Sequence, residues 1–165
     1  MNSASEKMKK SEPKRTWRIR PYTADDRQAV RDICCETGYS GQPIDPIFSD
    51  RDVFADFFTR YYTDFEPDAA LVVEDQGKIV GYLIGCTRYR LHAIMEKFLV
   101  AFVIAPKVIW RMATGRYNRS DRNFLWWSLT RGNKETPAAP KRSSHFHFNL
   151  LSAYRAQGVG PALLY

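Results

Sequence analysis

The first part of the chain changes from a strand pattern to a helix pattern. Trp17 to Arg20 alternates apolar and polar side chains and ends at Pro21, which predicts a short strand. Apolar residues then recur at helical spacing from Ala29 to Cys34. Thr23 is the predicted N-cap of this helix, acidic residues occupy its first turn, and Gly38 is its predicted end.

A second helix and a hairpin follow. Asp50 is the predicted N-cap of a helix whose apolar face comprises Val53, Phe54, Phe57, Phe58, Tyr61 and Tyr62. Residues 70–73 and 79–87 are two predicted strands joined by a tight Asp-Gln-Gly-Lys turn. Gly81 and Gly85 in the returning strand leave room for a close neighbour. The predicted order is therefore strand, helix, helix, strand, strand.

The next segment is basic, aromatic and helical. Short helices are predicted over residues 91–104, 106–112 and 122–129, followed by a loop over 132–140. Alternation of polar and apolar residues returns over residues 144–151, which predicts a fourth strand.

Charge is distributed unevenly along these segments. The net charge of the chain is +7. Lys and Arg minus Asp and Glu gives +5 for residues 1–20, −8 for 21–87, +9 for 88–142 and +1 for 143–165. The basic character therefore belongs to the first residues and to the helical segment, while the predicted body between them is acidic.

The remaining composition suggests an intracellular domain with a basic tail. The chain has three cysteines, of which Cys34 and Cys35 are adjacent in a predicted helix, and such a set forms no disulfide framework. A reducing, cytoplasmic location is therefore expected. Residues 1–16 are polar and lysine-rich without the apolar core of a signal peptide, so a disordered basic tail is predicted before a single domain over 17–165. The basic helical insert spans about 88–142.

The motif that carries chemistry lies at residues 155–160, directly after the fourth predicted strand. Glycines at 158 and 160 allow a sharp bend, and successive backbone N–H groups at the start of a helix suit a phosphate group. Two other glycine-rich motifs do not fit: Leu163 stands where the dinucleotide fingerprint needs glycine, and Pro161 stands where a Walker A loop needs lysine. A glycine turn without a ligand is the alternative.

The pattern Arg-x-x-Gly-x-Gly, after a Leu-Leu-Ser-Ala-Tyr step, resembles the acetyl-CoA loop of the GNAT superfamily of N-acetyltransferases. The upstream order of strands and helices agrees with that fold, and the resemblance covers residues 17–87 and 143–165. It implies an α/β (α+β) domain with a mixed, mainly antiparallel sheet flanked by helices. It also implies that the domain is C-terminally incomplete, because further strands and a helix normally follow in this family.

The resemblance implies a reaction and a cofactor site. The reaction is transfer of an acetyl group from acetyl-CoA, a co-substrate, to an amine on a small molecule or a peptide. Pantetheine would pair with the backbone near Leu150, Leu151 and Ser152. The pyrophosphate would bind the backbone N–H groups of residues 157–160, within a cofactor loop formed by Arg155, Ala156, Gln157, Gly158, Val159 and Gly160.

A histidine of the fourth predicted strand is the candidate general base. His145, His147 and Asn149 share one face of that strand. Imidazole titrates near neutral pH, and we predict that His147 accepts the proton of the acceptor amine, directly or through water. The alternative is that these histidines are half-buried and make structural hydrogen bonds. No metal site is predicted, because no acidic or cysteine cluster accompanies them and the third histidine, His92, lies in the insert.

The insert suggests other functions. Its longest uncharged stretch, residues 98–106, is too short to cross a bilayer. We expect its aromatic residues to pack on the core while its arginines are solvated, so that nucleic acid is not an expected partner and a membrane surface is not favoured. The alternatives to the enzyme are a basic module that binds membranes or nucleic acids, and a CoA-binding domain without turnover. Oligomerisation stays open. The aromatic residues concerned are Phe102, Trp110, Trp126 and Trp127.

Overall fold

The structure of the chain is a computed structural model that describes residues 16–132, 134 and 146–164. The predicted basic tail, apart from its last residue, lies outside these residues. So do His145 and nearly all of the loop predicted over 132–140.

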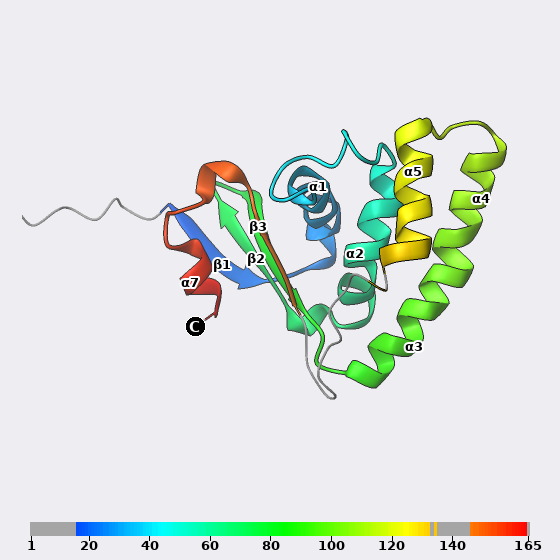
Figure 1. Cartoon of the computed structure of the whole chain (residues 1–165). Coiled ribbons are helices and arrows are strands. Elements are labelled where there is room, and N and C mark those ends of the chain that lie inside the picture. The colour runs from blue at the N-terminus through cyan, green and yellow to red at the C-terminus, as the bar shows by residue number, and fades with distance from the viewer. Residues whose placement is uncertain (1–15, 133, 135–145, 165) are drawn as a thin grey trace, which may run out of the picture.

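A four-stranded antiparallel sheet forms the centre of the molecule (Figure 1). Its strands are β1 (Trp17–Pro21), β2 (Ala70–Asp75), β3 (Lys78–Gly85) and β4 (Phe146–Leu150), and they lie side by side in that order. The tight turn between β2 and β3 has the positive φ angles that its Gln-Gly pair predicts. The predicted class, an α/β fold with a mainly antiparallel sheet flanked by helices, is confirmed.

Helices α1 (Arg27–Thr37) and α2 (Arg51–Phe65) cover one face of the sheet (Figure 1). Both predicted N-caps are confirmed. Thr23 forms a capping box with Asp26 at the start of a short 3-10 turn that leads into α1. The Asp50 carboxylate accepts the Val53 N–H at 3.1 Å. The main core lies between these helices and the sheet, although Phe57 of the predicted apolar face is exposed.

Gly38 follows α1 as predicted, but for a different physical reason. Its φ of −70° lies in the ordinary right-handed region, so no left-handed turn requires glycine there. A Cβ atom at this position would lie 2.6 Å from the Phe54 ring and 2.7 Å from Ile44. The end of α1 therefore needs a glycine because α2 and the following loop pack directly against its backbone.

The basic insert is helical, as predicted, and packs against α2 rather than against the sheet (Figure 1). Helix α3 (Tyr89–Leu99) continues through a π-helical turn (Val100–Ile104) into α4 (Ala105–Ala113). Helix α5 (Arg119–Trp127) then returns beside α2 and ends in a second π-helical turn over Ser128–Gly132. No helix of the described residues is long and apolar enough to span a membrane.

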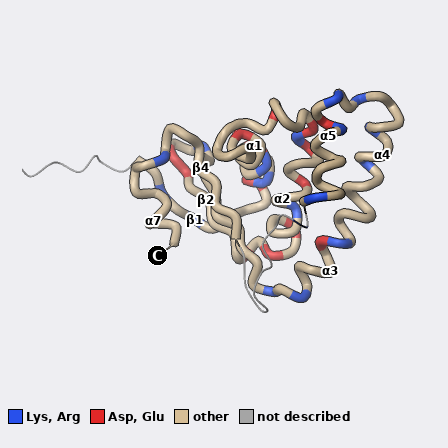
Figure 2. Tube along the Cα trace, viewed as in Figure 1, with Lys and Arg blue, Asp and Glu red and all other residues tan. Residues whose placement is uncertain are grey.

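Ion pairs between the insert and α2 explain why charge is separated along the chain (Figure 2). The Lys107 ammonium on α4 lies 2.9 Å from the Asp52 carboxylate and 2.6 Å from the Asp56 carboxylate on α2. The Arg111 guanidinium bonds Asp50 and, at 3.0 Å, Asp52. The acidic segment therefore supplies the carboxylates, and the basic insert the cations, of the interface between α2 and α4.

The aromatic residues of the insert correct the sequence prediction. We expected four of them to pack on the core, but the structure leaves all four exposed: Phe102, Trp110, Trp126 and Trp127. The insert residues that are buried in the core are Leu99 and Ile104, on the inner side of the α3–α4 helix, and Tyr117, which precedes α5. The sequence prediction relied on residue type, since aromatic residues are usually buried. In the structure, the side of the helix on which a residue lies determines whether it is buried.

Among the described residues, the opposite face of the sheet carries a single short helix, α7 (Val159–Leu164) (Figure 1). Its Val159 and Leu163 pack with Val73, Val80 and Leu150 in a second, smaller core. A β-bulge between β2 and β3, at Val73/Glu74, turns Val80 toward this face although Tyr82, two residues on, faces the main core. The small core fixes α7 and the loop before it against β4.

Candidate functional site

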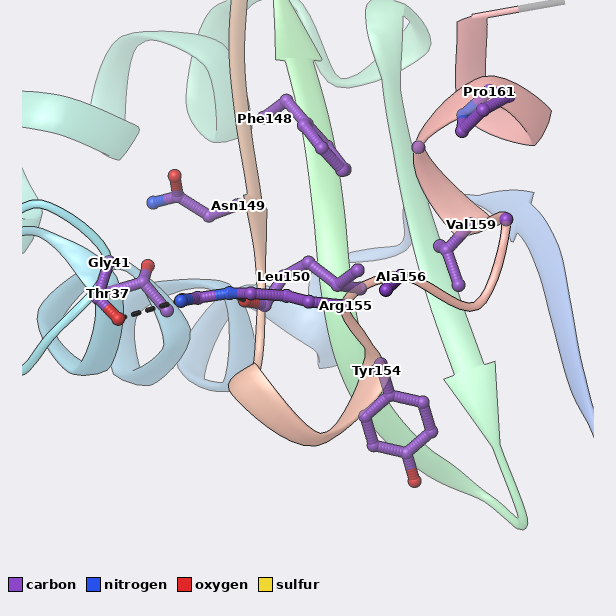
Figure 3. Close-up of a pocket in the computed structure, with 12 residues that line it drawn as sticks. Thr37, Gly41, Phe148, Asn149, Leu150, Tyr154, Arg155, Ala156, Val159 and Pro161 are labelled. Atoms are coloured by element: carbon purple, nitrogen blue, oxygen red, sulfur yellow. Dashed lines mark hydrogen bonds between the residues drawn. The ribbon is translucent and has the colours of Figure 1, made fainter.

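A cavity of about 570 Å³ opens at the C-terminal end of β4 (Figure 3). The end of α1, the loop after it, the last residues of β4 and the start of α7 form its walls. The lining residues are Thr37, Gly41, Phe148, Asn149, Leu150, Tyr154, Arg155, Ala156, Gly158, Val159, Gly160 and Pro161.

The cavity lies along the edge of β4 that has no partner strand among the described residues. The Leu151 N–H donates to the Val80 carbonyl at 3.0 Å, so the backbone of Leu151 is directed at β3. Because backbone direction alternates along an antiparallel strand, Phe148 and Leu150 present their N–H and C=O groups to the open edge. This edge is a row of backbone donors and acceptors that an extended ligand can pair with.

A close approach between β3 and β4 sets the position of this edge. Gly81 of β3 faces Leu150 in the register of the sheet. A Cβ atom at Gly81 would lie 2.5 Å from the Leu150 Cδ1 atom and 3.0 Å from the Asn149 carbonyl oxygen. The predicted need for a small residue at Gly81 is confirmed. At Gly85 the nearest atoms would be 3.8 Å away, so the same prediction is wrong there.

The loop between β4 and α7 has the conformation of an anion cradle. Ala156 and Gly158 adopt left-handed backbone angles, with φ of 61° and 77°. Within the described residues, no acceptor is recorded for the five consecutive N–H groups from Ala156 to Gly160. A Cβ atom at Gly158 would meet nothing within 4 Å, so the space beside the loop is open. Successive free N–H groups with alternating backbone hand form a concavity that binds anions.

Side chains on both ends of the loop hold it in place. The Arg155 guanidinium donates to the Leu150 carbonyl at 3.2 Å and to the Gly41 carbonyl at 2.8 Å (Figure 3). The Tyr154 hydroxyl donates to the Asp75 carboxylate at 2.8 Å, and this carboxylate raises the pKa of the tyrosine. Because Arg155 bonds two neutral carbonyls and no carboxylate, its positive charge stays uncompensated beside the cavity.

Buried polar groups lie beneath the cavity. The Asn149 amide donates to the Tyr82 hydroxyl at 2.8 Å, and Tyr82 in turn bonds the Cys34 thiol. Burial raises the pKa of Cys34 to about 11 and that of its neighbour Cys35 to about 12. Both thiols are therefore neutral at physiological pH and unsuited to nucleophilic attack, since the thiolate is the reactive form.

His147, the predicted base, is half-buried on the same face of β4 as Asn149. Its ring packs edge-on against Phe58, with centroids 6.0 Å apart, and against Tyr62, at 5.4 Å. It does not line the cavity. The catalytic role of His147 stays a prediction.

The structure brings most of the predicted cofactor residues together. Six line the cavity, namely Leu150, Arg155, Ala156, Gly158, Val159 and Gly160. Leu151, Ser152 and Gln157 do not, and the N–H of Leu151 is already bonded to β3. Six lining residues were missed: Thr37, Gly41, Phe148, Asn149, Tyr154 and Pro161. Within the described part of the chain, no group of three or more metal-binding side chains is close enough to hold an ion.

Comparison with known proteins shows similarity to a solved structure. No protein-family model matches the chain, and no curated protein matches it. Among solved structures, the acetyltransferase in "Crystal structure of SsHAT" is similar to this chain, with a TM-score of 0.66 and 28% sequence identity. The similarity covers 91% of this chain and 74% of that one. The chain therefore has an acetyltransferase-like fold, and the similarity supports an acetyltransferase function at that general level.

Proposed function

We propose that the chain is a GNAT-type N-acetyltransferase that transfers the acetyl group of acetyl-CoA to an amine. One observation carries the proposal: five consecutive free backbone N–H groups, from Ala156 to Gly160, border a cavity at the open edge of β4. The acetyltransferase-like fold supports it independently.

The loop is suited to the pyrophosphate of coenzyme A. A pyrophosphate carries several negatively charged oxygens, and each can accept from one or more of the five N–H groups. The uncompensated charge of Arg155 lies on the same wall of the cavity and favours an anion there. The described residues that line the cavity include no carboxylate, so none of them repels the phosphates.

The open edge of β4 is suited to pantetheine. Pantetheine has two amide groups, and the outward-directed backbone of Phe148 and Leu150 can pair with them as a neighbouring strand would. Arg155 already donates to the Leu150 carbonyl, so this part of the edge binds the ligand through its N–H or after Arg155 moves. A ligand that follows β4 from the loop toward Phe146 passes the level of His147, the predicted base.

The reaction requires two proton transfers, one from the attacking amine and one to the leaving thiolate. The neutral amine attacks the thioester carbonyl carbon, the C–N bond forms, and the C–S bond breaks to release the thiolate of coenzyme A. In our proposal His147 accepts the proton that the amine loses and passes it to solvent, and the leaving thiolate takes up one proton from water, so that no net proton is gained or lost. The neutral thiols of Cys34 and Cys35 support direct transfer without an acetylated cysteine.

The loop can be tested by calorimetry with coenzyme A, using Gly158→Asp and a matched control. An aspartate at 158 places a carboxylate beside the phosphates, and we expect binding to weaken ~30-fold or more, because like charges in a binding site cost several kcal/mol. Gly115→Asp is the control: Gly115 also has a positive φ, 70°, and open space around it, but does not line the cavity. It carries the same backbone strain and should bind coenzyme A as the parent does.

Turnover is tested separately, by thiol release from acetyl-CoA in the presence of a panel of amines. His147→Gln should retain binding and lose thiol release. Binding without release by the parent chain for every amine would favour the CoA-binding domain without turnover. If the parent chain fails to bind coenzyme A, or if Gly158→Asp binds as well as Gly115→Asp, the proposal is wrong.

A further inference from the structure

The outer side of the α3–α4 helix carries a stripe of exposed apolar residues. Ile94, Phe98, Phe102 and Ile109 are 65%, 49%, 69% and 67% exposed. The first three are four residues apart and the last is seven further on, so they share one face of the helix. The Phe98 and Phe102 rings contact each other, with centroids 4.8 Å apart. We call these four residues the outer stripe.

The outer stripe has no role in the core. The opposite side of the same helix already contributes Leu99 and Ile104 to the main core and Lys107 to the ion pairs with α2. Serine or lysine in the stripe would preserve every one of these contacts. A continuous apolar face of this kind on the outside of a folded domain marks an interaction site.

The insert that carries the stripe also carries basic residues that have no acidic partner in the described part of the chain. The insert contains seven exposed Lys or Arg side chains without an ion pair among the described residues: Arg90, Lys97, Arg116, Arg119, Arg122, Arg131 and Lys134. Among the described residues of the insert, Glu96 is the one exposed acid, since Asp121 is fully buried. Figure 2 shows where the Lys and Arg positions fall along α3, α4 and α5. A molecule that binds this surface through these side chains is therefore expected to be anionic.

We propose that the outer stripe and the unpaired basic residues of the insert bind the surface of an anionic phospholipid membrane. Lipid-facing surfaces combine bulky apolar side chains, which enter the acyl boundary, with Lys and Arg, which contact phosphate headgroups. Trp110 and Trp126 on the same insert are exposed, and tryptophan is the residue type that favours the headgroup region. The proposal does not depend on the acetyltransferase function.

Two other partners fit these observations less well. Nucleic acid would use the basic residues and could stack on Phe102 and the exposed tryptophans, but it gives no role to Ile94 and Ile109 of the stripe or to the exposed Leu129. A second copy of the chain would bring two sets of unpaired basic residues together, and like charges oppose that association. An anionic lipid surface offers acyl chains that contact the apolar stripe and phosphate headgroups that contact the basic residues.

The test is cosedimentation of the full chain with vesicles of phosphatidylcholine alone or mixed with phosphatidylglycerol. We expect binding to the anionic vesicles only, weaker at high salt. Phe102→Ser with Ile109→Ser should weaken it roughly tenfold to a hundredfold, because two exposed apolar side chains no longer enter the lipid. Leu164→Ser, an equally exposed residue on α7, is the matched control and should bind as the parent does.

Charge is tested by a second matched pair. Lys97→Glu reverses a charge next to the stripe and should weaken binding about tenfold. Lys78→Glu makes the same change on the β2–β3 turn and should have no effect. Three outcomes would overturn the proposal: equal binding to neutral vesicles, a dimer in light scattering that the double serine variant abolishes, or oligonucleotide binding that the same variant abolishes. Equal binding by the variants and their controls would also overturn it.

Discussion

At the scale of single residues, Glu66 shows how a buried charge is held in this fold. Its carboxylate lies at the end of α2 and is almost fully buried. It accepts from the Tyr61 hydroxyl, the Thr87 N–H at 2.8 Å, the Thr87 hydroxyl at 2.6 Å and the Arg88 N–H at 3.2 Å. Burial acts to raise the pKa of this carboxyl, but the hydrogen bonds outweigh it and lower the pKa to about 2.

We expect Glu66→Gln to lower the free energy of unfolding by roughly 2 to 3 kcal/mol at pH 7, because the amide NH₂ of glutamine meets donors instead of acceptors. The folded-state pKa lies below the ordinary value of 4.5, so the stabilisation is complete above about pH 4.5 and is lost as the pH falls toward 2. Urea unfolding from pH 7 to pH 3 measures this. The difference between parent and variant should shrink over the lower part of that range.

Glu96→Gln is the control for this experiment. Glu96 is an exposed acid on α3, and its replacement should change stability by less than about 0.5 kcal/mol at every pH. A difference between parent and Glu66→Gln that stays constant down to pH 3 would show that the carboxylate is not held by these hydrogen bonds.

At the scale of elements, the contact between β3 and β4 links the fold to the candidate site. We expect Gly81→Ala to destabilise the protein by about 2 kcal/mol, because its Cβ atom would overlap Leu150 and press on the Asn149 carbonyl. Both residues line the cavity, so coenzyme A binding should weaken as well. Chemical denaturation and calorimetry measure the two effects.

Gly85→Ala makes the same substitution on the same strand, where the nearest atoms would be 3.8 Å away. This variant should leave the free energy of unfolding unchanged or raise it slightly, because alanine lowers the conformational entropy of the unfolded chain. Equal losses for the two variants would mean that a general cost of alanine in β3, and not the approach of β4, explains the effect.

The attachment of the insert is a second element-scale property. Asp56 is buried on α2 and bonds Arg31 at 2.5 Å and Lys107 at 2.6 Å. We expect Asp56→Asn to cost about 2 kcal/mol, because it removes the buried carboxylate that Arg31 and Lys107 share and leaves Asp52 as the remaining carboxylate bonded to both. Asp68→Asn, at an exposed site, should stay within about 0.5 kcal/mol of the parent. Urea unfolding compares them, and similar midpoints for both variants would contradict this role of Asp56.

These elements show what the sequence could and could not predict. Helices with clear caps, such as the one begun by Asp50, and the hairpin with its Gln-Gly turn were predicted because the signal lies within a few residues. The glycine loop over residues 155–160 was singled out for the same reason, and its role in cofactor binding stays a prediction. Thr37 and Gly41 were missed because they reach the cavity from a segment more than a hundred residues away, and only folding brings Gly41 to Arg155.

The aromatic residues of the insert were misjudged for a related reason. Hydrophobic character predicts burial on average, but which side of the α3–α4 helix meets the core depends on α2. The salt bridges from Lys107 and Arg111 to α2 fix that side. The charge count separated an acidic body from a basic insert, but we expected the arginines of the insert to be solvated, and Arg111 instead pairs with Asp50 and Asp52. These pairs could not be identified from the sequence because they join residues more than fifty positions apart.

At the scale of the whole molecule, the two proposed surfaces lie at opposite ends. The cofactor loop and α7 lie beyond the sheet on one side, and the α3–α4 helix lies beyond α2 on the other (Figure 1). The sheet, with α1 and α2, forms a packed layer between them. No residue of the outer stripe lines the cavity, and no cavity residue belongs to the insert.

We therefore expect the two binding activities to be independent. Changes at distant sites without shared partners add in free energy, so the Phe102→Ser, Ile109→Ser variant should bind coenzyme A within about twofold of the parent. In the reverse experiment Gly158→Asp should bind anionic vesicles as the parent does. Calorimetry with and without vesicles completes the test. If vesicles changed coenzyme A affinity more than about fivefold, by reciprocity coenzyme A would change vesicle affinity equally, and the packed layer between them would have to transmit a conformational change.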